Sequence, residues 1–99
     1  MPDLGLSNEA LESYEALEHD QSRWPTLDKV EEALEAVADD PGSRDHRLRR
    51  FQDPPCFVVP VVTPEGDWVV LWRQVTEDDE FSNLVAGDVY VLYLGALPT

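Results

Sequence analysis

The residues best suited to chemistry form a short basic segment, residues 43–51, in the middle of the chain. It contains four arginines: Arg44, Arg47, Arg49 and Arg50. A guanidinium stays charged and holds phosphate through paired donors, so this segment could bind a phosphate group. Phe51, at its end, could stack on a nucleic-acid base. The alternative is that these arginines form surface ion pairs with the many carboxylates of the chain.

Two further side chains could take part in such a site. Arg73 falls late in an expected strand and would complete a small anion-binding site if it projected toward the basic segment. Its alternative role is an ion pair with a neighbouring acid. His46 lies among the arginines, whose charge favours a neutral imidazole that could act as a base. A histidine in a loop can equally be solvated and inactive.

The overall charge works against a simple nucleic-acid-binding role. The 99 residues include 21 acidic and 7 basic side chains, for a net charge of −14. Residues 1–40 carry −10, residues 41–52 carry +3, and residues 53–99 carry −7. Such a charge repels nucleic acid and anionic membranes. The acidic side chains clustered in the first 40 residues could instead imitate a phosphate backbone and occupy a basic protein.

Other kinds of site are disfavoured by residue type and spacing. The single cysteine, Cys56, cannot form an internal disulfide and is expected to be a buried apolar residue. The four acids at 77–80 lack the alternating ligands and glycine of a calcium loop, and two histidines are too few for a convincing metal site. We therefore expect neither metal nor cofactor. No apolar run is long enough to span a membrane and no signal-peptide pattern is present, so a cytoplasmic protein without a membrane partner is expected.

The first half of the chain has the apolar spacing of two helices. The first begins at Ser7 or Asn8, where a side chain can cap the helix, and ends near His19. The second begins near Pro25 and continues to the helix-breaking pair at residues 41–42, with an apolar stripe at three- and four-residue spacing. We expect an antiparallel helical hairpin, whose stripes need a partner surface.

The second half has the composition of β-strands. Residues 56–63, 67–76 and 88–94 are rich in β-branched and aromatic residues, and a turn at residues 64–67 joins the first two. Pro60 requires an edge or a bulge in the first strand. Trp68 and Trp72 are expected in the core, with a partner-binding groove as the alternative. The prediction is a single α+β domain over residues 1–99, in which the helical hairpin packs on a three- to four-stranded antiparallel sheet. The fourth strand would come from the N-terminus or from residues 47–52.

The order of these parts resembles the RelE/ParE superfamily of bacterial toxin–antitoxin modules. The resemblance is carried by the start of the first helix at Leu6–Ala10, the end of the second at Ala38–Pro41, the segment Arg47–Arg49 and the three closing strands. It extends over residues 5–95. It implies a toxin-like protein that is neutralised by an antitoxin protein.

The resemblance also implies an activity and the residues that would perform it. RelE-type toxins are metal-independent, ribosome-dependent endoribonucleases that cut mRNA and repress translation, whereas ParE-type toxins inhibit DNA gyrase. By this resemblance, four arginines would hold the RNA phosphates and a fifth residue, His46 or Tyr93, would transfer the proton. The four are Arg47, Arg49, Arg50 and Arg73. Because these toxins are usually basic, two alternatives stand beside the nuclease: a non-enzymatic acidic binding protein, and a toxin fold that has lost catalysis.

Overall fold

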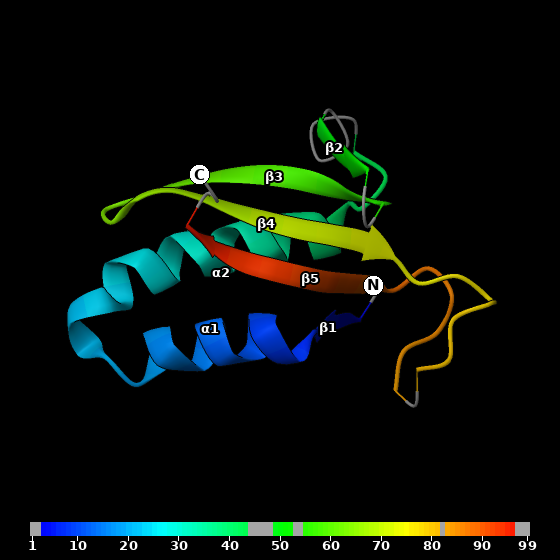
Figure 1. Cartoon of the computed structure of the whole chain (residues 1–99), viewed down its shortest axis with the longest axis horizontal. Helices are drawn as coiled ribbons and strands as arrows, with labels where there is room; N and C mark the ends of the chain where they lie inside the picture. Colours follow the sequence, from blue (N-terminus) through cyan, green and yellow to red (C-terminus); the bar gives the residue numbers. More distant parts are fainter. Residues whose placement is uncertain (1–2, 44–48, 53–54, 82, 97–99) are drawn as a thin grey trace.

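The computed structural model describes residues 3–43, 49–52, 55–81 and 83–96 (Figure 1). The elements, in chain order, are β1 (Leu4–Leu6), α1 (Asn8–Glu18), the 3₁₀ helix η1 (Gln21–Arg23), α2 (Trp24–Asp39), β2 (Arg49–Gln52), β3 (Pro55–Thr63), β4 (Gly66–Gln74) and β5 (Val89–Ala96). Both helices and the last three strands, β3, β4 and β5, therefore lie in the halves of the chain where the sequence pattern predicts them.

The two helices begin where local chemistry favours it. Ser7 caps α1, because its hydroxyl oxygen accepts the N–H of Ala10 at 3.1 Å. The same hydroxyl donates to the carbonyl of Leu92 at 2.6 Å, which fixes the start of α1 against β5. Pro25 lies in the first turn of α2, where its missing N–H leaves no helical bond unmade.

The sheet has five strands in the order β1-β5-β4-β3-β2, and it is mixed. The pairs β2–β3, β3–β4 and β4–β5 are antiparallel, whereas β1 runs parallel to β5. The prediction of a three- to four-stranded, purely antiparallel sheet is therefore wrong, although the α+β class with two helices is confirmed. Both the N-terminal segment and residues 49–52 contribute a strand. A strand as short as β1 has no pattern that reveals its direction, which is set by the distant strand it meets.

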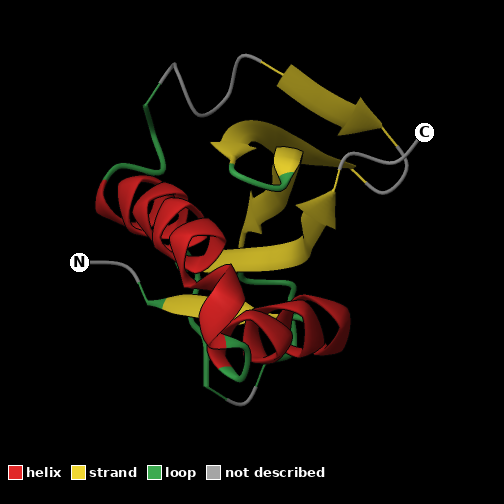
Figure 2. Cartoon of the chain, turned by 90° about the vertical axis from the view of Figure 1, so that its left-hand side faces the viewer, coloured by secondary structure: helices red, strands yellow, loops and turns green. Residues whose placement is uncertain are grey.

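The core lies between one face of the sheet and the two helices (Figure 2). Alternation along β4 sends Trp68, Val70 and Trp72 to this face, and all three are buried. They meet the apolar stripes of the helices, which include Leu17 and Leu34. The expectation that both tryptophans belong to the core is confirmed.

Two irregularities shape the sheet. Between Leu71 and Trp72 the pairing with β5 shifts, because Leu71 lies opposite Tyr93 and Trp72 opposite Val91. Pro60 lies beyond the four β3 residues that pair with β2, so β3 forms the edge of the described sheet at that point. The prediction of an edge position for Pro60 is thus confirmed, and its missing N–H costs no ladder hydrogen bond.

Candidate functional site

The guanidinium of Arg73 contacts one carboxylate and two aromatic rings. Its Nη1 and Nη2 atoms donate to the two carboxylate oxygens of Asp79 at 2.8 and 3.0 Å. The guanidinium also lies over the rings of Phe81 and Tyr90, with centroid distances of 5.8 and 5.5 Å. The ion-pair alternative for Arg73 is the arrangement that the structure contains. This guanidinium holds the loop after β4 against the sheet.

The same contacts make Asp79 a much stronger acid than usual. Hydrogen bonds from Arg73 and from the backbone N–H of Thr76 hold the pKa of Asp79 well below its usual range, and the bonds to Asp79 raise the pKa of Arg73. Asp79 thus stays ionised in the folded protein at a pH where it would take up a proton in the unfolded chain, near pH 4. Its contribution to stability is complete above that pH and decreases as the pH falls below it.

We therefore expect the stability difference between the wild type and Asp79→Asn to depend on pH. Denaturant unfolding should show a clear destabilisation at pH 7 that becomes smaller at pH 3, because the unfolded wild-type chain takes up a proton at Asp79 there while the folded protein keeps the carboxylate ionised. Asp78→Asn, an exposed neighbour in the same loop, is the matched control. Equal losses at both pH values would show that the charge of Asp79 does not matter.

Arg50 and Arg73 do not come together, because they lie on opposite faces of the sheet. Arg50 is paired with Phe57, and its guanidinium lies 4.9 Å from the centroid of that ring. Phe57 is in turn paired with Trp72, and their rings are 4.9 Å apart. Arg50 thus belongs to the row that ends in the core, whereas Arg73, the next residue after Trp72, points to the other face.

The remaining predicted site residues do not link Arg50 to Arg73 in the described structure. Arg49 lies in β2 opposite Val58 in the register, and Arg47 and His46 lie outside the described residues. Tyr93 lies in β5, and its hydroxyl donates to the carbonyl of Ala96 at 2.9 Å. The structure therefore does not assemble a pocket of guanidiniums from the residues that it describes.

An ion pair not anticipated from the sequence lies near Tyr93. Arg23 donates to both carboxylate oxygens of Glu65, from Nη2 at 2.9 Å and from Nε at 3.1 Å. It connects the start of α2 to the turn between β3 and β4. Together with Trp68 and Tyr93 this pair lines a cavity of about 370 Å³. Because the two partners are 42 residues apart, no local pattern predicts the contact.

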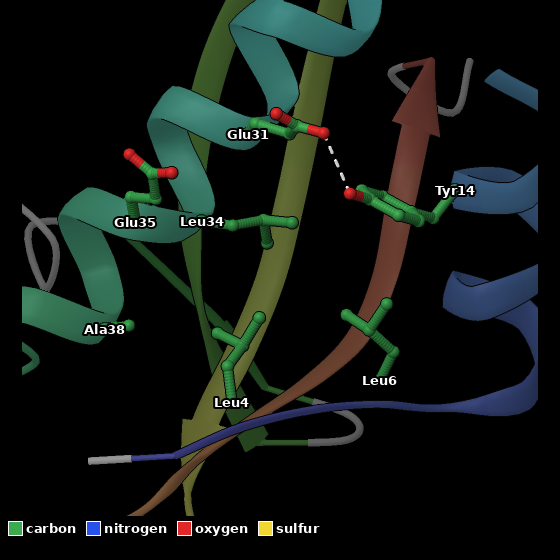
Figure 3. Close-up of a pocket in the computed structure, with 7 residues that line it drawn as sticks. All are labelled: Leu4, Leu6, Tyr14, Glu31, Leu34, Glu35 and Ala38. Carbon is green, nitrogen blue, oxygen red and sulfur yellow. Dashed lines mark hydrogen bonds between the residues drawn. The ribbon is translucent and has the colours of Figure 1, made fainter. Parts of the chain in front are cut away.

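A cavity with an apolar floor lies between α1, α2 and β1 (Figure 3). We call it the acidic pocket, and its volume is about 340 Å³. Leucine side chains from β1 and α2 form its floor, and two carboxylates of α2 and one phenol of α1 stand around it. Its lining residues are Leu4, Leu6, Tyr14, Glu31, Leu34, Glu35 and Ala38.

Each element brings its residues to the acidic pocket by its own periodicity. In β1, Leu4 and Leu6 are two residues apart and lie on one face. In α2, the four lining residues are spaced by three, one and three, which places them on one side of the helix. The hydroxyl of Tyr14 donates to Oε1 of Glu31 at 2.8 Å across the pocket (Figure 3). The sequence shows the apolar stripes of both helices, but no local pattern indicates that β1 would complete the lining of the pocket between them.

The surroundings of Tyr14 disfavour its ionisation. Burial raises the pKa of Tyr14 to about 12, and its hydrogen bond to Glu31 and the negative charges of Glu31, Glu18 and Glu35 act in the same direction. A phenolate here would be poorly solvated and would face carboxylates. The pocket is therefore a place where added negative charge is unfavourable and added positive charge is favourable.

This environment predicts a distinct alkaline titration. The difference in absorbance near 295 nm between the wild type and Tyr14→Phe should have its midpoint at about pH 12, against roughly 10 for an ordinary tyrosine. Because the folded-state pKa is raised, the stability linked to Tyr14 is complete below pH 10 and is lost as the pH rises toward 12. A difference spectrum with its midpoint near 10 would contradict the described contact with Glu31.

Other kinds of site find no support in the described residues. None of the groups of histidine, cysteine, aspartate and glutamate described by the structure could hold a metal ion. Within the same residues, no helix has the length and apolar character needed to cross a membrane. Cys56 is buried, and burial raises the pKa of its thiol, which confirms the expectation of a buried apolar residue. No family model, curated protein or solved structure matches the chain.

Proposed function

We propose that this protein is a non-enzymatic, acidic binding module whose acidic pocket receives a positively charged segment of a partner protein. The observation that carries the proposal is the combination of a leucine floor with Glu31 and Glu35 beside it. A lysine or arginine side chain has the complementary form, because its apolar stem can cover leucine while its charged end reaches a carboxylate. A leucine side chain would lack the positive charge, and a serine or aspartate side chain would lack both the apolar stem and the positive charge.

The charge distribution supports the same proposal. Residues 1–40, which supply β1 and both helices, carry a net charge of −10. A basic segment is therefore attracted toward the layer that contains the acidic pocket, and this attraction raises the rate of association at low salt. Because the charges are largely exposed, the attraction is screened at high ionic strength.

The arginines of the described chain also favour binding over catalysis. Arg23 and Arg73 are each paired with a carboxylate, and Arg50 lies on the opposite face of the sheet from Arg73. A ribonuclease needs an acid, a base and charge stabilisation close together. An acidic pocket without a convergent cationic group is better suited to holding a cation than to cleaving a phosphodiester.

The test uses a synthetic eight-residue peptide of alternating lysine and threonine, and measures its affinity by calorimetry. We expect binding at 50 mM salt that weakens at least about tenfold at 500 mM. The double variant Glu31→Gln with Glu35→Gln should weaken binding at 50 mM salt at least about tenfold, and it keeps an oxygen that can accept the Tyr14 hydrogen bond.

The matched control is Glu77→Gln with Glu80→Gln, which removes the same charge from the exposed loop after β4. It should change the affinity less than about twofold if the pocket, and not the net charge, is responsible. Equal weakening by both double variants would overturn the proposed site. Absence of peptide binding by the wild type at 50 mM salt would overturn the proposed function.

The second candidate is the endoribonuclease toxin, or a toxin fold that has lost catalysis, with an antitoxin as the partner. It is supported by the resemblance to RelE/ParE toxins and by Arg50, which is exposed and forms no ion pair with a carboxylate of the described chain. Inducible expression should then arrest growth and protein synthesis, and Arg49→Ala with Arg73→Ala should relieve the arrest. Growth unaffected by the wild-type protein would argue against an active toxin.

A further inference from the structure

One edge of the described sheet is formed by β1. The backbone of β1 bonds to β5 through its flanking residues: the N–H of Val89 donates to the carbonyl of Asp3, and the N–H of Ser7 donates to the carbonyl of Val91, both at 2.9 Å. Alternate residues of a parallel strand bond to the same neighbour, so the intervening Leu4 and Leu6 direct their N–H and C=O groups outward. Among the described residues, no strand pairs with this outer edge.

Cavities lie on both faces of this edge strand. The acidic pocket is lined by Leu4 and Leu6 on the helix side. A second cavity, of about 240 Å³, is lined by Gly5, Ser7 and residues of the loop before β5, and we call it the polar pocket; Leu6 borders both cavities. Gly5 keeps this loop close to β1, because a Cβ atom on Gly5 would lie 2.6 Å from Cδ1 of Leu84.

The two pockets have different linings. The acidic pocket has an apolar floor and carboxylates. The polar pocket is lined by the polar residues Ser7, Asn8 and Asn83 together with the aromatic residues Phe81 and Tyr90. Successive side chains of an extended strand point to opposite sides. A strand added at the edge of β1 would therefore send every second side chain toward one pocket and the residues between them toward the other.

We propose that the partner segment binds as an additional β-strand on the outer edge of β1. Basic residues at every second position enter the acidic pocket, and small polar residues between them face the polar pocket. The basic character of the segment rests on the proposed function, whereas the strand pairing is a separate inference from the edge and its two pockets. Leu4 and Leu6 together offer two backbone donors and two acceptors, and the side chains in the pockets determine which sequence is selected.

The experiment compares the lysine–threonine peptide with two N-methylated forms of it. One form carries methyl groups on the lysine amides and the other on the threonine amides. In an extended strand these two sets of amides face opposite edges, so only one set can meet β1. We expect one form to bind at least about tenfold more weakly than the parent peptide and the other to bind within about twofold of it.

Which of the two methylated forms loses affinity also shows whether the added strand runs parallel or antiparallel to β1. In an antiparallel pair the residue opposite Leu4 exchanges hydrogen bonds with it and shares its face, so methylated lysine amides would abolish pairing. In a parallel pair the bonded residue lies opposite Gly5 and points to the polar pocket, so methylated threonine amides would do so. In either case the backbone amides of Leu4 and Leu6 should exchange with solvent at least about tenfold more slowly when the parent peptide is bound.

The results separate this inference from the proposed function. If both methylated forms bind as tightly as the parent and the exchange of Leu4 and Leu6 is unchanged, the strand addition is wrong, while charge-dependent binding stands. If the parent peptide does not bind at 50 mM salt, both proposals are wrong. Selective loss with one methylated form, together with slowed exchange at Leu4 and Leu6, establishes the added strand.

Discussion

Trp72→Ala is expected to lower the free energy of unfolding by about 4 kcal/mol, the largest effect of any single substitution considered for this protein. Trp72 is fully buried, and its ring lies 4.9 Å from that of Phe57. Truncation removes this contact and leaves a cavity beneath both helices. Because small domains are stabilised by only about 5–15 kcal/mol, the variant should unfold at a much lower urea concentration.

Trp24→Ala is the matched control for this prediction. Trp24 is 46% exposed, and its Nε1 donates to the carbonyl of Glu18 at 3.1 Å. The same chemical change at this position should cost no more than about 1 kcal/mol, because little apolar surface is uncovered and one exposed hydrogen bond is lost. Similar losses at both positions would contradict the placement of Trp72 in the core.

Asp88→Ala is expected to lower the free energy of unfolding by about 3 kcal/mol, through lost hydrogen bonds to a buried carboxylate. Only 6% of Asp88 is exposed. Its Oδ1 accepts the N–H of Asp3 at 3.0 Å, and its Oδ2 accepts the N–H of Val85 at 2.9 Å. It therefore holds the residue before β1 and the loop before β5 at the same point. Urea denaturation of the variant measures the loss.

The control for Asp88 is Asp78→Ala, in the exposed part of the loop after β4, which should change the stability by less than about 0.5 kcal/mol. The Asp88 variant has a second expected result, because Asp3 positions the start of β1. In the absence of urea, and at a temperature where the variant is still folded, its affinity for the lysine–threonine peptide should be lower than that of the wild type. Unchanged stability would show that the two N–H groups find other partners.

The elements that the sequence predicts well are those with a strong local pattern. The stripe of α2, the capping hydroxyl of Ser7, and the β-branched runs of β3 and β4 each restrict the backbone within about ten residues. Pro60 likewise restricts its own strand position, because it has no N–H to donate. These features need no knowledge of distant residues.

The candidate site could not be predicted in the same way. Arg73 forms an ion pair with Asp79, six residues later, and does not form a shared site with Arg50. The sequence of the acid-rich loop does not indicate which of its carboxylates contacts Arg73. Arg50 lies on the helix-facing side of the sheet because it pairs with Phe57, and Phe57 in turn pairs with Trp72. A difference of one residue in this register would exchange the faces.

Sequence alone determined the α+β composition, the two apolar helical stripes, the antiparallel order of the last three strands and the strongly acidic first half. Tertiary structure alone decided that β1 lies parallel to β5 and that Leu4 and Leu6 meet Tyr14, Glu31 and Leu34 in one pocket. The physical reason is the sequence separation over which each interaction acts, because periodicity and capping involve residues only a few positions apart in the chain. The pocket instead depends on the pairing of β1 with a strand 85 residues away in the chain, and that pairing is set by the packing of the whole core.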